Sequence, residues 1–90
     1  MEYKIIIYKQ AKKDREKIRQ NPALAKTTDK LIEILKINPF QNPPPYEKLQ
    51  GEILGLYSRR INIKHRLVYS VNEENKEVLI LSLWTHYDNI

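Results

Sequence analysis

The first apolar block of the chain is short and uninterrupted. Residues 3–8 read Tyr-Lys-Ile-Ile-Ile-Tyr, and β-branched and aromatic residues in such a run predict a β-strand. Three consecutive isoleucines leave no polar alternation, which is typical of a strand covered on both faces. We therefore expect this strand to lie in the centre of a sheet.

A weakly amphipathic segment follows this strand. Residues 9–20 are mostly Lys, Arg, Asp, Glu, Gln and Ala, which helices tolerate or favour. Only Tyr8, Ala11 and Ile18 mark an apolar stripe at helical spacing. We therefore expect a helix that is thinly anchored and largely solvated.

The second helix has clearer boundaries. Asn21 is a good N-cap and Pro22 suits a first helical turn, whereas Asn38-Pro39 is expected to end the helix. Its core face repeats at helical spacing in Leu24, Thr28, Leu31 and Leu35, with Ile34 beside them.

The second half of the chain predicts the rest of the sheet. Residues 38–46 hold four of the five prolines, which excludes regular structure there and predicts an extended connector. Strands are expected at 57–63, 66–72 and 77–87, with a hairpin turn at 72–76. The order β-α-α-β-β-β predicts an α+β fold, with two helices packed on one face of a mainly antiparallel sheet. We expect a single domain over residues 1–90.

Composition and charge narrow the function. The chain has 90 residues, of which 41% are hydrophobic and 30% charged. Its net charge of +5 favours polyanions such as RNA, acidic proteins or anionic lipid. The absence of Cys excludes disulfides and thiolate chemistry, and two histidines are too few for a typical structural zinc site. We expect neither a metal nor a cofactor. No apolar run approaches the roughly 20 residues of a membrane span, and the N-terminal block is too short for a signal peptide, so a cytoplasmic protein is expected.

Five short motifs follow one another between residues 39 and 87. In chain order they are Pro39-Phe40, Pro45-Tyr46-Glu47-Lys48-Leu49, Gly55-Leu56-Tyr57-Ser58-Arg59-Arg60-Ile61, His65-Arg66-Leu67-Val68-Tyr69 and Trp84-Thr85-His86-Tyr87. Each motif alone is weak, and their ordered combination is specific. Their order and spacing in a small basic protein resemble the YoeB/Txe-type toxins of the RelE superfamily, whereas the N-terminal half agrees in element order only.

This resemblance implies a function and partners. It implies the toxin of a type II toxin–antitoxin system, an endoribonuclease (mRNA interferase) that cleaves translated messenger RNA on the ribosome by metal-free attack of the 2′-hydroxyl. It also implies a YefM-like antitoxin, contact with operator DNA only through the antitoxin complex, and frequent homodimers.

Cleavage of this kind requires three chemical groups. A base takes the 2′-hydroxyl proton, a cation stabilises the crowded phosphorane-like state, and an acid protonates the leaving 5′-oxygen. By resemblance these are Glu47, Arg66 and His86, and Tyr87 stacks on or orients the nucleotide. From the residues alone, Glu47 is interpreted as a solvent-exposed glutamate and Arg66 as an arginine in a cross-strand ion pair. His86 is interpreted as a structural histidine.

Alternation along the strands predicts which residues share a face with Arg66. Leu67 and Tyr69 are apolar and are expected to face the helices, which leaves Arg66 on the open face. Arg60 alternates with polar neighbours and is expected on that open face, whereas Arg59 is less suited to reach the site. The expected RNA contacts are Lys48, Arg59, Arg60, Lys64 and His65, the last at most as support on the substrate side.

The sequence departs from the family at three places. The loop before Glu47, usually rich in glycine and lysine, carries Pro43-Pro44-Pro45. The position three places after the glutamate, usually basic, holds Gln50. Asp88-Asn89-Ile90 continue beyond the His-Tyr pair.

Two alternatives stay open. One is a non-ribonuclease toxin of the same fold, such as a gyrase-directed ParE-like toxin, which generally lacks the Glu/Arg/His set. The other is a plain RNA-binding domain, for which a Gly-aromatic RNP signature is absent. Loss of messenger RNA that depends on translation distinguishes all three.

Overall fold

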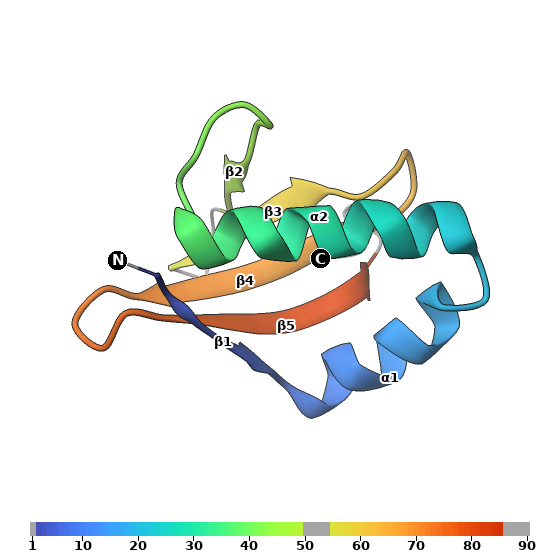
Figure 1. Cartoon of the computed structure of the whole chain (residues 1–90), viewed down its shortest axis with the longest axis horizontal. Helices are drawn as coiled ribbons and strands as arrows, with labels where there is room; N and C mark the ends of the chain where they lie inside the picture. The colour runs from blue at the N-terminus through green and yellow to red at the C-terminus, as the bar shows by residue number, and fades with distance from the viewer. Residues whose placement is uncertain (1, 50–54, 86–90) are drawn as a thin grey trace.

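The computed structural model describes residues 2–49 and 55–85, which form two helices and a five-stranded sheet (Figure 1). The predicted α+β fold is confirmed, and the structure adds a short strand, β2, which the proline-rich sequence around it did not indicate. In chain order the elements are β1 (Lys4–Ile7), α1 (Lys9–Ile18), α2 (Pro22–Ile37), β2 (Glu47–Lys48), β3 (Leu56–Arg60), β4 (Arg66–Asn72) and β5 (Glu77–Thr85).

The described strands lie in the order β1-β5-β4-β3-β2. β1 pairs with β5 in parallel, and the other neighbours are antiparallel. The prediction that β1 is central was wrong, because β1 forms one edge of this sheet. Its apolar run has another cause: Ile5 and Ile7 pack against the core that the helices cover.

Both helices contribute to one hydrophobic core on one face of the sheet. Leu67 and Tyr69 of β4 are 0% exposed in that core, as alternation along the strand predicted. The buried members of the core are Ala11, Ile18, Leu31, Leu35, Ile61, Leu67, Tyr69, Val78, Ile80 and Leu83.

Helix α2 begins and ends where the sequence predicted. The side-chain oxygen of Asn21 accepts hydrogen bonds from the backbone N–H groups of Ala23 and Leu24, at 3.1 and 3.3 Å, which is the usual N-cap arrangement. The last helical residue, Ile37, directly precedes Asn38.

Helix α1 is anchored by a buried carboxylate as well as by apolar residues. Ala11 and Ile18 are buried as predicted, but Tyr8 is 46% exposed and does not belong to the buried stripe. Asp14 is only 3% exposed, and its Oδ2 accepts a hydrogen bond of 2.9 Å from the backbone N–H of Leu83 in β5. The carboxylate therefore connects α1 to the last part of β5. The sequence did not predict this contact, because Asp14 is one of many charged residues in a polar helix.

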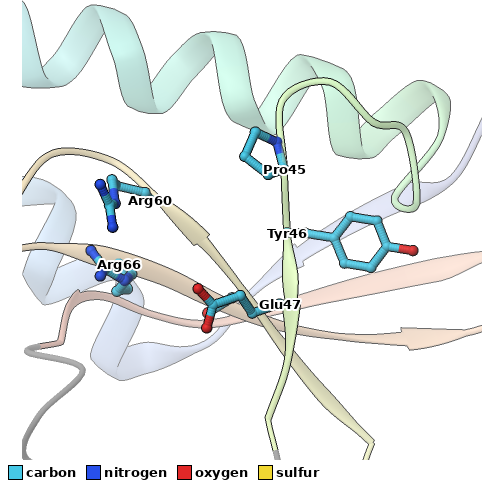
Figure 2. Close-up of a pocket in the computed structure, with 6 residues that line it drawn as sticks. Pro45, Tyr46, Glu47, Arg60 and Arg66 are labelled. Atoms are coloured by element: carbon cyan, nitrogen blue, oxygen red, sulfur yellow. The ribbon is translucent and has the colours of Figure 1, made fainter.

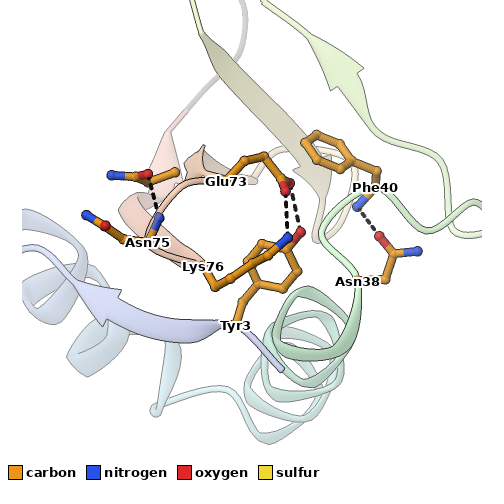
Figure 3. A network of polar contacts seen from close by, with 7 residues as sticks. Tyr3, Asn38, Phe40, Glu73, Asn75 and Lys76 are labelled. Atoms are coloured by element: carbon orange, nitrogen blue, oxygen red, sulfur yellow. Dashed lines mark hydrogen bonds and ion pairs between the residues drawn. The ribbon is translucent and has the colours of Figure 1, made fainter. Parts of the chain in front are cut away.

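The hairpin between β4 and β5 is closed by polar contacts (Figure 3). The carboxylate of Glu73 accepts from the hydroxyl of Tyr3 at 2.7 Å and from Nζ of Lys76 at 3.0 Å. The hydrogen bond from Tyr3, together with that from Lys76, lowers the pKa of Glu73. These contacts join the turn to the start of the chain.

In the described residues, no helix is long and apolar enough to cross a membrane.

Candidate active site

A pocket of about 260 Å³ lies where β2, β3 and the start of β4 meet. In Figure 2 the side chains of Glu47, Arg60 and Arg66 gather at the same place, whereas the ring of Tyr46 points away from the two arginines. The residues that line the pocket are Pro45, Tyr46, Glu47, Ser58, Arg60 and Arg66.

Strand register brings these side chains together from distant parts of the sequence. Glu47 of β2 is paired with Ser58 of β3, and Arg60 of β3 is paired with Arg66 of β4. Ser58 and Arg60 are two residues apart on one strand and therefore point to the same face. The predicted placement of Arg60 and Arg66 together, away from the helical core, is confirmed, and Ser58 joins them as a lining residue that was not predicted.

A tight turn between β3 and β4 sets the start of β4. The side-chain oxygen of Asn62 accepts from the backbone N–H groups of Lys64 and His65, at 2.9 and 2.7 Å. The guanidinium of Arg66 in turn donates to the backbone carbonyl of Asn62 at 3.3 Å. The strand predicted at 57–63 therefore ends at Arg60, because the side-chain oxygen of Asn62 accepts both of these hydrogen bonds and so stabilises a turn.

The lining side chains form a compact set for phosphate chemistry. Two guanidinium groups can donate several charge-assisted hydrogen bonds to phosphate oxygens. A carboxylate at hydrogen-bond reach of a hydroxyl can accept its proton. In residues 2–49 and 55–85, no group of three or more His, Cys, Asp or Glu side chains that could hold a metal ion occurs.

Arg59 lies on the other side of the strand from Arg60, and the residue is 1% exposed. Its guanidinium donates to the backbone carbonyls of Pro44, Pro39 and Gln41 at 2.7, 3.0 and 2.9 Å. The expectation of an RNA contact at Arg59 is corrected by this placement, because the group is enclosed beneath the proline-rich loop.

His65 also faces inward, with 7% of its surface exposed. Its ring stacks on that of Trp84, with the ring centroids 3.9 Å apart and the planes inclined by 26°. The expected RNA contact at His65 is therefore corrected: the ring of His65 packs against Trp84 in the interior.

The remaining predicted residues lie outside the pocket or outside the described part of the chain. Lys48 and Lys64 are exposed and do not line the pocket; Lys48 follows Glu47 on β2 and so points to the opposite face. His86 and Tyr87 lie beyond the described residues, as do Gln50 and the segment 88–90.

Comparison with known proteins identifies the family. A sequence model described as the YoeB-like toxin of bacterial type II toxin–antitoxin systems matches residues 8–87. Toxin YoeB from Synechocystis sp. is 38% identical over 64 residues, which cover 71% of this chain and 72% of that protein. Toxin RelK from Mycobacterium tuberculosis is 40% identical over 63 residues, or 70% and 72% of the two chains.

Solved structures share the fold. The YoeB/ParE toxin from Agrobacterium tumefaciens superposes with a TM-score of 0.85 at 27% identity, over 93% of this chain and 99% of that one. The toxin in the YoeB–YefM complex from Staphylococcus aureus superposes with a TM-score of 0.79 at 33% identity, over 94% and 98%. The YoeB dimer from the same organism gives 0.81 with the same identity and coverage. The chain therefore belongs to the YoeB-like toxins of bacterial type II toxin–antitoxin systems, as the motifs between residues 39 and 87 predicted.

Proposed function

We propose that this toxin is an endoribonuclease that cleaves messenger RNA during translation and so inhibits protein synthesis. The observation that carries the proposal is that Glu47, Arg60 and Arg66 line one pocket from three different strands. Such a combination of one carboxylate and two guanidinium groups matches the needs of RNA cleavage through the 2′-hydroxyl, in which RNA supplies its own nucleophile.

In the proposed reaction the carboxylate of Glu47 accepts the proton of the 2′-hydroxyl. The 2′-oxygen then forms a bond to the adjacent phosphorus, and the bond from phosphorus to the 5′-oxygen of the next nucleotide breaks. Arg66 and Arg60 donate hydrogen bonds to the non-bridging phosphate oxygens, on which negative charge develops. The products are a 2′,3′-cyclic phosphate and a 5′-hydroxyl, and no metal ion takes part in the proposed steps.

The pairing of the two arginines supports a phosphate ligand. Like charges directly opposite each other on neighbouring strands destabilise a sheet, and Arg60 and Arg66 hold such positions. A phosphate between them relieves this repulsion and is gripped by planar groups that can each bind two oxygens.

The acid of the reaction is proposed from the family resemblance. His86 would protonate the leaving 5′-oxygen, since imidazole can donate a proton near neutral pH, and Tyr87 would stack on or orient the nucleotide. The role of His86 rests on the resemblance alone, because the described part of β5 ends at Thr85.

The proposed partner is a YefM-like antitoxin, as in the complex from Staphylococcus aureus. A toxin with a net charge of +5 favours an acidic antitoxin segment that folds as it binds. Operator DNA would be contacted through that complex, and a homodimer like that of the Staphylococcus aureus toxin is proposed for the free protein. A ribosomal target implies action in the cytoplasm.

Primer extension on a translated message tests this function. Purified toxin is added to a reconstituted translation reaction, and we expect new RNA ends within the translated region. The ends should be absent when initiation is blocked and absent with a Glu47→Gln toxin. Intact message in the presence of wild-type toxin would contradict the proposal, and equal cleavage without initiation would contradict dependence on the ribosome.

A further inference from the structure

Arg59 is the largest fully buried side chain of the described residues, and all its hydrogen-bond acceptors lie in one loop. Its two terminal nitrogens donate to the carbonyls of Pro39, Gln41 and Pro44 at 2.7 to 3.0 Å. Three charge-assisted hydrogen bonds from one planar group fix three points of the loop relative to β3.

The loop has few backbone N–H groups with which to hold its own shape. Four of residues 38–46 are prolines, which have no backbone N–H to donate. Its first part is held by Asn38, which accepts from the N–H of Phe40 through its side chain at 3.0 Å (Figure 3) and from that of Gln41 through its backbone at 3.1 Å. Tyr69 adds a hydrogen bond from its hydroxyl to the carbonyl of Pro39 at 2.8 Å.

In the later part of the loop, which leads into β2, the side chain of Gln41 donates to the carbonyl of Pro43 at 3.2 Å, and the ring of Tyr46 packs against Phe40 and Tyr57. Arg59 supplies the hydrogen bond that joins this part of the loop to β3.

Arg59 also contacts the residue next to the proposed base. Its guanidinium carbon lies 5.1 Å from the ring centroid of Tyr46, a cation–π distance. Tyr46 directly precedes Glu47, and Figure 2 shows the two side chains pointing away from each other, with Glu47 toward the arginine pair. Since β2 has only two residues, both exposed, its own packing holds Glu47 weakly.

We infer that Arg59 is a positioning residue, which holds the proline-rich loop so that Glu47 is aimed at the 2′-hydroxyl. The inference rests on the proposed function. It gives Arg59 a role through Glu47, whereas Arg60 and Arg66 would bind the phosphate directly. The hydrogen bonds of Arg59 therefore constrain a proline-rich loop, at the place where the family usually carries a loop rich in glycine and lysine.

Substitution of Arg59 by Met should therefore lower the cleavage rate without weakening RNA binding. Misplacement of a reacting group by about 1 Å can cost on the order of 10²-fold in rate. We expect the single-turnover rate on ribosome-bound message to fall by roughly 10- to 100-fold. The affinity for RNA should stay within about twofold, because the two phosphate-binding arginines remain in place.

The decisive comparison repeats the substitution in a Glu47→Gln background. If Arg59 acts through Glu47, the residual single-turnover rate of Glu47→Gln should not fall further when Arg59→Met is added. Ile18→Ala, a core substitution in α1, serves as the matched control for lost stability, and it should lower the two backgrounds equally or not at all. Arg59→Lys, which keeps the charge but not the planar fork, should recover only part of the rate and stands in if Arg59→Met does not fold.

Amide hydrogen exchange gives a readout that needs no cleavage. In the Arg59 variants the N–H group of Leu49, which donates to the carbonyl of Leu56 at 2.9 Å, should lose protection, whereas those of β4 should keep it. A rate loss of equal size in both backgrounds, weaker RNA binding with an unchanged rate, or unchanged protection of Leu49 would overturn the inference. Inactivity of the wild-type protein would instead overturn the proposed function.

Discussion

Arg60 and Arg66 are direct cross-strand partners in the antiparallel pair of β3 and β4, and both line the pocket that also receives Glu47. Two like charges in such positions work against sheet stability. Proteins commonly accept this kind of cost at sites whose ligand carries the opposite charge. The arrangement therefore predicts that a phosphate anion stabilises the folded protein through these two residues.

The phosphate effect can be measured as a thermal shift. Inorganic phosphate should raise the melting temperature of the wild-type protein more than chloride does at equal ionic strength, because it binds the folded state. Arg60→Ala should lose this specific increment. Lys30→Ala, which removes one exposed positive charge from α2, should keep it. Equal phosphate increments in the wild type and in Arg60→Ala would rule out anion binding between the arginines.

The buried carboxylate of Asp14 should matter more for stability than its place in a polar helix suggests. Asp14→Ala leaves the backbone N–H of Leu83 without its acceptor, and a buried donor without a partner costs about 1–3 kcal/mol. Asp29→Ala is a suitable control, because its contact with Arg15 is long, at 3.5 Å, and largely exposed. Urea denaturation should show a clear loss of unfolding free energy for the first variant and little for the second. Similar values for both would mean that Asp14 does not anchor α1.

We expect the buried hydroxyl of Tyr69 to make the folded protein less stable at alkaline pH. Burial raises the pKa of its hydroxyl from 10.0 to about 12. As the pH rises above 10, the unfolded chain releases this proton while the folded protein keeps it, so the unfolded state is favoured progressively until about pH 12. At neutral pH, Tyr69→Phe should be less stable than the wild type by about 1 kcal/mol, the usual value of one hydrogen bond. The difference should shrink across pH 10–12, and a constant difference there would contradict the raised pKa.

The antitoxin should cover the face that carries the pocket. We expect its acidic segment to mask Glu47 and Arg66, together with His86, or to displace Tyr87. Affinity should fall steeply with salt, and Arg60→Ala should weaken binding more than Lys30→Ala. A complex in which the antitoxin contacts only the two helices and leaves the pocket open would refute direct masking.

Local patterns predicted the parts of this structure that depend on neighbours in sequence. The ends of α2 followed from Asn21 and Asn38-Pro39, and alternation in β4 correctly separated Arg66 from Leu67. These features have a fixed period or a fixed capping chemistry, so that the residues alone carry the information.

The features that were missed depend on distant partners. The acceptors of Arg59 are backbone carbonyls 15 to 20 residues away, and the donor to Asp14 is 69 residues away. Neither contact leaves a mark in side-chain periodicity. The edge position of β1 likewise results from its parallel pairing with β5, which hydrophobicity alone cannot specify.

The central claim, that this pocket cleaves RNA, is tested most directly by the single-turnover cleavage rate of ribosome-bound message with wild-type, Arg66→Ala and Arg66→Lys toxins. Loss of one such electrostatic stabiliser typically costs about 10²–10³ in rate. We expect a loss of that size for Arg66→Ala, with the fold and its melting temperature preserved, and poor recovery in Arg66→Lys, since lysine cannot grip two oxygens in one plane. Cleavage at nearly the wild-type rate by a folded Arg66→Ala protein would contradict the account.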